Sequence, residues 1–370
     1  MGIPRSWLLK LACSALGNDR GFIVSRSTFV GAGTAATHWL GDNFSGWDDL
    51  RVSIVGMLDF NMFGFPFVGA DICGHFGNST AELCKRWMQL GAFYGFCRNH
   101  NAVGNRDQDP ASFSEEVSRV SREALETRYW LLPYLYTLFH QVHTQGGTVM
   151  RPLHHEFVQD VTSRSISKQF LWGPSLLISP IMEPYALSVA LYFPPARWYN
   201  LYTGDVTSQD GGHWSSEAVL PYTNIPLHVR GGAILPLQRP ALNTTFSRLN
   251  KMALIAALDT RGSARGSLFW DDGTSRDTFN RGNYAHITFD ASGGQLNGSV
   301  IHNGITQDTN FLLYESIDIW GVENVSNTVT ISIDKKPFVD IAYDFNKAKQ
   351  ILKLMPQRLS IAHSFTIKWT

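Results

Sequence analysis

The sequence predicts an α/β fold followed by all-β domains. Over roughly the first 150 residues, strand-like apolar runs alternate with amphipathic segments, the pattern of parallel strands joined by helices. After Thr148, short alternating or β-branched runs are separated by Gly, Pro, Asn and Asp turns, which is typical of all-β domains. The length of 370 residues allows two to three domains of about 100–200 residues each.

Three strand-loop-helix units make up the α/β part. A loop of glycines and polar residues, 31–45, follows the first strand. Capping boxes, Ser45 with Asp48 and Ser79 with Glu82, are expected to open two helices. A long third helix is expected to break at Pro133. The expected strands are 22–25, 66–70 and 92–96, and the third helix covers 114–143.

The all-β part exceeds the usual size of one sandwich, so we expect two β-sandwiches with a connector at 237–248. Its strand-like runs are 175–181, 189–193, 252–258, 266–270, 284–289 and 325–333. The predicted organisation is an atypical amino-terminal segment (1–19), an α/β part (20–150), a proximal sandwich (151–240) and a distal sandwich (241–370).

The composition narrows the function classes. With 31 basic and 31 acidic residues, the formal net charge is zero, which excludes a nucleic-acid binder that relies on bulk charge. A hydrophobic content of 44% excludes a disordered chain. The 11 Trp, 12 Tyr and 23 Phe often lie beside Gly or charged residues, an arrangement that suits stacking on sugars. A large aromatic core explains the same numbers, so both interpretations stay open.

The amino terminus carries only weak targeting signals. Its basic residue, apolar stretch and small residues loosely resemble a signal peptide, but Lys10 interrupts the apolar stretch. Gly2 and Ser6 fit the short spacing of an N-myristoylation signal, which is frequent by chance. No apolar run approaches the roughly 18–20 residues that span a bilayer, so no transmembrane segment is expected in this chain.

The cysteines and sequons favour a secretory-pathway setting. Cys13, Cys73, Cys84 and Cys97 are not expected to bind metal, because they form no C-x-x-C pair and no His cluster of ligand spacing lies near them. Cys73 and Cys84 flank a short loop and a helix start, where a local disulfide fits an oxidising compartment. The candidate glycosylation sites are Asn43, Asn78, Asn243, Asn297 and Asn324.

Polar side chains gather in the loops that follow the three expected strands, and such loops meet at one edge of a parallel sheet. Together these polar side chains predict a pocket that binds hydroxyl groups through hydrogen bonds. The alternative is that Arg26 and Asp71 form a structural ion pair and that His100 caps a loop. The residues are Arg26, His38, Trp39 and Asp42 in the first loop, Asp71 in the second, and Arg98, Asn99, His100 and Asn101 in the third.

Long motifs extend from about residue 20 to the end of the chain. They include Arg26-Ser-Thr-Phe29, His38-Trp-Leu-Gly-Asp-Asn43, Val68-Gly-Ala-Asp-Ile-Cys-Gly74, Arg98-Asn-His-Asn101, His228-Val-Arg-Gly-Gly-Ala-Ile-Leu-Pro236 and Phe269-Trp-Asp-Asp-Gly-Thr-Ser275. These motifs resemble glycoside hydrolase family 31, and within it the maltase-glucoamylase and sucrase-isomaltase group. The resemblance implies the last three strand-helix units of a (β/α)8 barrel, followed by proximal and distal β-sandwiches.

The resemblance also implies a retaining α-glucosidase that removes terminal α-1,4-linked glucose from maltose or starch oligosaccharides, without metal or organic cofactor. Asp42 matches the acid/base, and Arg26, Trp39, Asp71 and His100 match residues around the bound glucose. The remaining matches are His75 and Phe76 for a wall of the site, and Cys73 with Cys84 for a disulfide of the group.

The departures from the family bear on activity. The family nucleophile lies in a Trp-x-Asp-Met-Asn-Glu stretch that this sequence lacks, and a His stands at position 75, where the family has a Phe. We therefore expect little turnover by this chain alone, and an amino-terminal part of the barrel as its partner. The alternative is a non-catalytic pseudoenzyme or partial gene product that at most binds α-glucan or a partner. The family implies a secretory, extracellular or cell-surface location.

Overall fold

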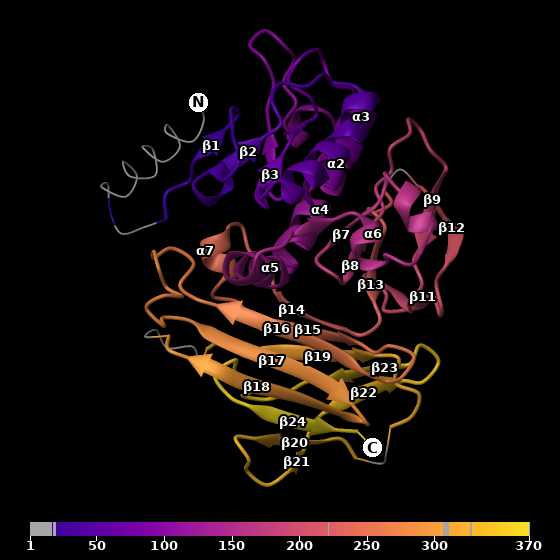
Figure 1. The fold of residues 1–370 in the computed structure, drawn as a ribbon. Helices are drawn as coiled ribbons and strands as arrows, with labels where there is room; N and C mark the ends of the chain where they lie inside the picture. Colours follow the sequence, from indigo (N-terminus) through magenta and orange to yellow (C-terminus); the bar gives the residue numbers. More distant parts are fainter. Residues whose placement is uncertain (1–16, 18–19, 221, 306–310, 326–327, 370) are drawn as a thin grey trace. The chain divides into compact units, whose positions relative to one another are not determined.

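The structure is a computed structural model that describes residues 17, 20–220, 222–305, 311–325 and 328–369 (Figure 1). The candidate signal peptide and myristoylation signal lie outside the described residues. The chain forms two compact units: the first comprises residues 1–128, 141–194 and 212–227, and the second 129–140, 195–211 and 228–370. In the described part of the chain, no helix is both long and apolar enough to cross a membrane.

The first unit is built on short parallel strands. Strands β1 (Val24–Ser25), β2 (Thr37–Trp39) and β3 (Val68–Gly69) form one sheet, and β4 (Asp71–Ile72) pairs with β5 (Arg98–Asn99). The helices that follow the strands are α2 (Trp47–Met62), α3 (Ala81–Gly91) and α4 (Glu115–Trp130). Short 3-10 turns at Ala32–Thr34 and Pro110–Ser112 lie in the loops.

Strand β2 lies inside the segment 31–45 that was expected to be a loop. Backbone hydrogen bonds to β1 and β3 hold it as a parallel strand. A strand of three residues is too short to be recognised from alternating hydrophobicity in the sequence. The third expected strand, 92–96, is also displaced, because the chain turns at 92–96 and pairs as β5. Both shifts move polar residues onto strand ends.

The helix starts lie one residue later than the expected capping boxes. Gly46, not Ser45, is the N-cap of α2 and provides no side-chain cap. Thr80, not Ser79, caps α3, because its hydroxyl accepts from the Leu83 amide at 3.2 Å. The long helix divides as expected near Pro133, which lies in the first turn of α5 (Leu132–Gln145), where proline is tolerated.

Helix α2 packs through one face into the core of the first unit. Leu50, Ser53, Ile54, Met57, Leu58 and Asn61 are buried at helical spacing. The Ser53 hydroxyl lies 2.5 Å from the Tyr94 hydroxyl, which also accepts from the Trp87 indole at 3.0 Å. Burial raises the pKa of Tyr94, so its hydroxyl stays neutral in this network. The network fixes α2 against α3 and thereby the strand ends before them.

The first unit also contains the strands that follow the helices. They are β6 (Met150–Arg151), β7 (Phe170–Trp172) and β8 (Leu176–Ile178), with α6 (Leu153–Glu156) and a 3-10 turn at Thr162–Ser165, and the antiparallel pair of β9 (Ser188–Phe193) with β12 (His213–Ala218). The Trp172 indole donates to the Phe93 carbonyl at 2.8 Å, which ties these strands to the turn after α3.

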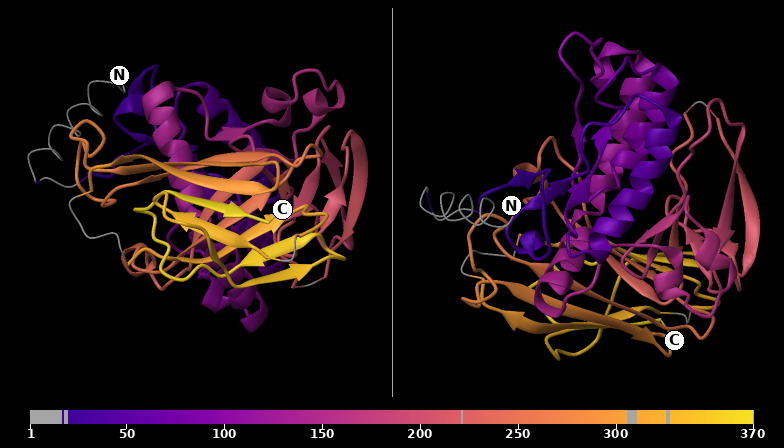
Figure 2. Two further views of the ribbon diagram at one scale, coloured as in Figure 1. Left: turned by 90° about the horizontal axis from the view of Figure 1, so that it is seen from below. Right: turned by 45° about the horizontal axis from the view of Figure 1, so that its top comes forward.

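The second unit is dominated by one sheet of 11 strands that curls into two layers around an apolar core (Figure 2). Strand β17 shows the alternating burial expected of a strand with one face on a core. Strands β10 (Trp198–Asn200), β11 (Val206–Ser208) and β13 (Leu227–Arg230) and helix α7 (Thr244–Ser247) complete the unit. The sheet comprises β14 (Ala233–Gln238), β15 (Met252–Ala257), β16 (Ala264–Trp270), β17 (Ala285–Ser292), β18 (Gln295–Asn303), β19 (Tyr314–Trp320), β20 (Thr330–Ile333), β21 (Val339–Asp340), β22 (Tyr343–Asn346), β23 (Ile351–Leu354) and β24 (Phe365–Lys368).

The sandwich boundary predicted near residue 240 falls just after β14. That strand pairs with β15 and β16, so it belongs to the sheet of the later strands. β14 belongs to that sheet because all six of its residues pair with the six residues of β15, which follows the predicted connector 237–248. The domain limits 20–150, 151–240 and 241–370 stay predictions, because the two compact units divide the chain differently.

Replacing Ile54 by Ala should destabilise the first unit by about 2–5 kcal/mol, since Ile54 is fully buried and truncation leaves a cavity. Urea unfolding followed by circular dichroism measures the effect. Val55→Ala is the matched control, because Val55 is 43% exposed on the same helix and should shift stability by less than about 0.5 kcal/mol. Equal losses for the two variants would contradict the packing of α2.

Candidate active site

Arg26 and Asp42 lie at the carboxyl ends of neighbouring parallel strands. Arg26 follows β1 directly, and Asp42 follows β2. The Arg26 guanidinium is 3.8 Å from the Asp42 carboxylate, and the two side chains are 62% and 26% exposed. Gly41, at φ +95°, allows this approach, because a Cβ there would come within 2.9 Å of the Arg26 Nε. The acid/base candidate therefore faces solvent beside a cation.

Asp71 is paired with Arg98 rather than with Arg26, so the structural ion pair considered from the sequence is not formed. The Arg98 Nη2 and Nε atoms donate to one Asp71 oxygen at 2.7 and 3.2 Å. Asp71 is fully buried, and burial raises its pKa, although Arg98 opposes the shift. Arg98 was expected in the pocket without a role of its own; its place in Arg98-Asn-His-Asn101 was its signal in the sequence.

Trp39 lies under two guanidinium groups. The Arg98 Cζ is 4.6 Å from the centre of the indole, and the Arg26 Cζ is 5.7 Å from it. Both distances fit cation–π contacts. Trp39 also meets the His100 ring edge to face at 6.4 Å. Arg26, Trp39, Asp42 and His100, which were predicted to share a site, are therefore linked through direct contacts, and Asp71 joins them through Arg98.

His75 and Phe76 lie beside this group. The rings of His75 and His100 are 4.6 Å apart, and the Phe76 ring meets His75 edge to face at 4.6 Å. Phe76 is 40% exposed and also contacts Phe44 at 5.4 Å. These contacts agree with the expected wall, with a polar imidazole in its centre. That role for His75 and Phe76 stays a prediction.

Two amide side chains hold the loops of the site together. Asn43 donates to the Asp71 carbonyl at 3.0 Å and accepts from the His75 amide at 3.0 Å. Buried Gln108 donates to the Gly74 carbonyl, the Asn99 side chain and the His100 carbonyl at 3.0–3.1 Å. Gln108 was not predicted from the sequence, because it lies in a polar loop without a motif.

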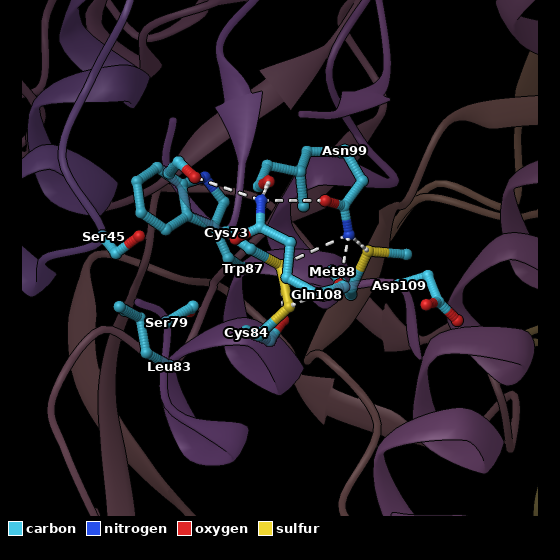
Figure 3. The surroundings of a disulfide bond; sticks show 12 residues. Ser45, Cys73, Ser79, Leu83, Cys84, Trp87, Met88, Asn99, Gln108 and Asp109 are labelled. Carbon is cyan, nitrogen blue, oxygen red and sulfur yellow. Dashed lines mark hydrogen bonds between the residues drawn. A yellow bond between two sulfur atoms is a disulfide. The ribbon is translucent and has the colours of Figure 1, made fainter. Parts of the chain in front are cut away.

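Cys73 and Cys84 form a disulfide that joins β4 to α3, next to Gln108 and Asn99 (Figure 3). Cys97 is a free thiol whose sulfur lies 2.9 Å from the Gly91 carbonyl, and burial raises its pKa. The bridge fixes the strand that carries Asp71. Cys13 lies outside the described residues.

His38 faces the core instead of the pocket. Its ring stacks on Phe60 with centres 3.6 Å apart, and it is 4% exposed. Burial lowers its pKa to about 4. The alternation of a strand explains this, because His38 and Trp39 point to opposite faces of β2.

The sequons differ in their surroundings. Asn78, Asn243 and Asn324 are exposed, whereas Asn43 and Asn297 are partly buried and hydrogen-bonded through their side chains. Asn43 uses its amide nitrogen inside the site, which conflicts with a glycan there. Glycosylation at the other positions stays a prediction.

Known proteins match both parts of the chain. Residues 8–138 match the "Glycosyl hydrolases family 31 TIM-barrel domain", and residues 146–235 match the "Glycosyl hydrolase family 31 C-terminal domain". The chain belongs to glycosyl hydrolase family 31. The predicted fold class, the carboxyl-terminal part of a TIM barrel followed by β-sandwich structure, is confirmed by these matches.

Individual relatives cover nearly all of the chain. It is 48% identical over 336 residues to "Probable maltase-glucoamylase 2" of Homo sapiens and 44% identical over 355 residues to intestinal sucrase-isomaltase of Suncus murinus. These alignments cover 91% and 95% of this chain but only 13% and 19% of the relatives. A crystal structure of the glucosidase II alpha subunit, bound to alpha3-Glc2, matches 95% of this chain and 40% of its own, at 27% identity and a TM-score of 0.88.

The neutral state of buried His38 should make folding pH-dependent. The unfolded imidazole takes up a proton near pH 6.5, whereas the folded one resists until about pH 4. The stability it contributes is therefore complete above pH 6.5 and is lost as the pH falls toward 4, by about 3 kcal/mol in total. Urea midpoints measured between pH 7.5 and 4.5 should fall less steeply in His38→Phe than in the wild type.

His143→Phe is the control for this experiment, since it removes an exposed imidazole from the same unit. Its pH dependence should equal that of the wild type. An unchanged slope in His38→Phe would show that His38 is not the group responsible.

Reducing the Cys73–Cys84 bridge should lower the stability of the first unit by about 3 kcal/mol, the entropy of a loop closed over a sequence separation of 11. Thermal unfolding with and without dithiothreitol measures the loss. The double variant Cys73→Ser/Cys84→Ser should show the lower midpoint in both conditions. A reductant effect that persists in this variant would assign the loss to another group.

Proposed function

We propose that the chain carries part of the active site of an α-glucosidase that acts on terminal α-1,4-linked glucose of maltose or starch oligosaccharides. The main support for this proposal is a cluster of contacting side chains at the ends of adjacent parallel strands: Arg26, Trp39, Asp42, Asp71 and Arg98. Charged groups and an aromatic face side by side suit a polyhydroxylated ring. Relatives named maltase-glucoamylase, sucrase-isomaltase and lysosomal alpha-glucosidase support this substrate class.

Asp42 is proposed as the acid/base. In a retaining hydrolysis, a protonated carboxyl group gives its proton to the departing glycosidic oxygen while a second carboxylate attacks the anomeric carbon. The same group then removes a proton from the water that releases the sugar. Asp42 is accessible for this exchange, because it is partly exposed, and the Arg26 guanidinium, 3.8 Å from its carboxylate, can orient it.

The remaining groups are proposed to bind the sugar. The Asp71 carboxylate is oriented by Arg98 and, with His100, can pair with sugar hydroxyls, while Trp39 offers an aromatic surface. No metal or organic cofactor takes part in this scheme. Because the sequence has no Trp-x-Asp-Met-Asn-Glu stretch, we propose that the nucleophile comes from a further part of the barrel, and that this chain alone binds maltose with little turnover.

The location of the protein follows from the same proposal. An enzyme on dietary or lysosomal α-glucans works in the secretory pathway or outside the cell. The relatives named intestinal sucrase-isomaltase and lysosomal alpha-glucosidase support such a location, and the disulfide is compatible with it.

Isothermal titration of the folded chain with maltose tests the site. Arg26→Ala should weaken binding at least about tenfold, the effect of losing hydrogen bonds to a charged group. Arg265→Ala is the control, since Arg265 is an exposed arginine paired with an aspartate, Asp290, in the second unit. Absence of maltose binding by the folded chain would contradict the proposal and favour the non-catalytic alternative.

Hydrolysis of an aryl α-glucoside tests the catalytic assignment. The chain alone should hydrolyse it at the background rate. Turnover that disappears in Asp42→Asn would contradict the expected inactivity, while confirming Asp42 as acid/base. Turnover that Asp42→Asn leaves unchanged would refute the assignment of Asp42.

A further inference from the structure

Three side chains in the site bring electron-pair donor atoms close to one another. A carboxylate oxygen of Asp71 and a ring nitrogen from each of His75 and His100 all lie within 4.8 Å of one another. Asp71 begins β4, His75 lies in the following loop, and His100 follows β5. The parallel pairing of β4 with β5 brings the three together. Sequence spacing could not show this group, because 25 residues separate the two histidines.

Two polar atoms of these side chains are buried without a hydrogen-bond partner among the described residues: the Asp71 Oδ2 and the His75 Nδ1. Asp71 is fully buried, and Arg98 satisfies only its other oxygen. A buried polar atom without a partner is costly, and such atoms in a native protein commonly mark a ligand. Both orphan atoms can donate an electron pair to a cation.

We propose that Asp71, His75 and His100 form a binding site for a divalent transition-metal ion of the Zn²⁺ type. Two imidazoles and one carboxylate are a ligand set that Zn²⁺ accepts, with water completing the tetrahedron. The proposed hydrolysis does not require this ion, because glycoside hydrolysis uses two carboxyl groups. His75 is the decisive ligand, because the family resemblance places a phenylalanine there.

Side-chain amides hold the backbone of both loops that carry the histidines. The His75 amide donates to Asn43, and the His100 carbonyl accepts from Gln108. Zinc at about 2.0–2.2 Å from each ligand separates the ligand atoms by roughly 3.4 Å, and the three donors of this group lie within 4.8 Å of one another. Arg98 holds Asp71 from the opposite side as an outer partner, and its charge lowers the affinity of the site.

If the proposed sugar site is also correct, the ion and the sugar compete, because Asp71 and His100 serve both. The metal site itself does not depend on that function. It can therefore be tested without any sugar.

The test is titration of the full chain with ZnCl₂ by calorimetry, and with CoCl₂ by visible absorption, which reports nitrogen and oxygen ligands directly. We expect one saturable site per chain. His75→Phe should weaken Zn²⁺ binding at least about tenfold and abolish the Co²⁺ bands; His100→Ala should do the same if the first variant folds poorly. Circular dichroism establishes folding.

His154→Phe is the matched control, because His154 and His155 form another imidazole pair in the same unit, with ring centres 4.9 Å apart. Its Zn²⁺ affinity and Co²⁺ spectrum should equal those of the wild type. Undiminished binding in His75→Phe, loss of binding in His154→Phe, or no saturable site in the wild type would overturn the proposal.

Discussion

The ion pair between buried Asp71 and Arg98 is the interaction on which the site depends. The two residues are direct partners in the parallel register of β4 and β5, so strand pairing itself brings the carboxylate to the guanidinium. Burial of Asp71 is costly and raises its pKa, and the Arg98 guanidinium opposes that shift. The main role of the pair is therefore to orient side chains and not to stabilise the fold. It leaves one Asp71 carboxylate oxygen available to the site and holds the Arg98 guanidinium over Trp39.

The loops around that pair are fixed by a dense set of local restraints. The disulfide joins β4 to α3, while Asn43 links the loop after β2 to the loop after β4. Gln108 reaches three loop groups from a buried position. Loops with so many restraints can place side chains precisely enough for recognition, as polar sites require. The same rigidity lets His75 and His100 remain close although no covalent link joins their loops.

The position of His75 changes the chemical character of this site within its family. A phenylalanine side chain has no lone pair with which to coordinate a metal ion, whereas an imidazole beside His100 and a buried carboxylate has one. The proposed metal site rests on this one position. Arg26, which we propose for the sugar site, contacts both Trp39 and Asp42 beside it.

The sequence alone determined the fold class, the change of texture near Thr148 and the family, because periodicity and long motifs are local properties. It also identified Asp42, Asp71 and His100 as candidate site residues, because each lies at a defined position of a sequence motif. Only the tertiary structure decided that Arg98 pairs with Asp71, that His38 turns into the core and that β14 joins the later strands. These outcomes depend on strand register and on which face of a three-residue strand is buried, and neither quantity is encoded in a single local pattern.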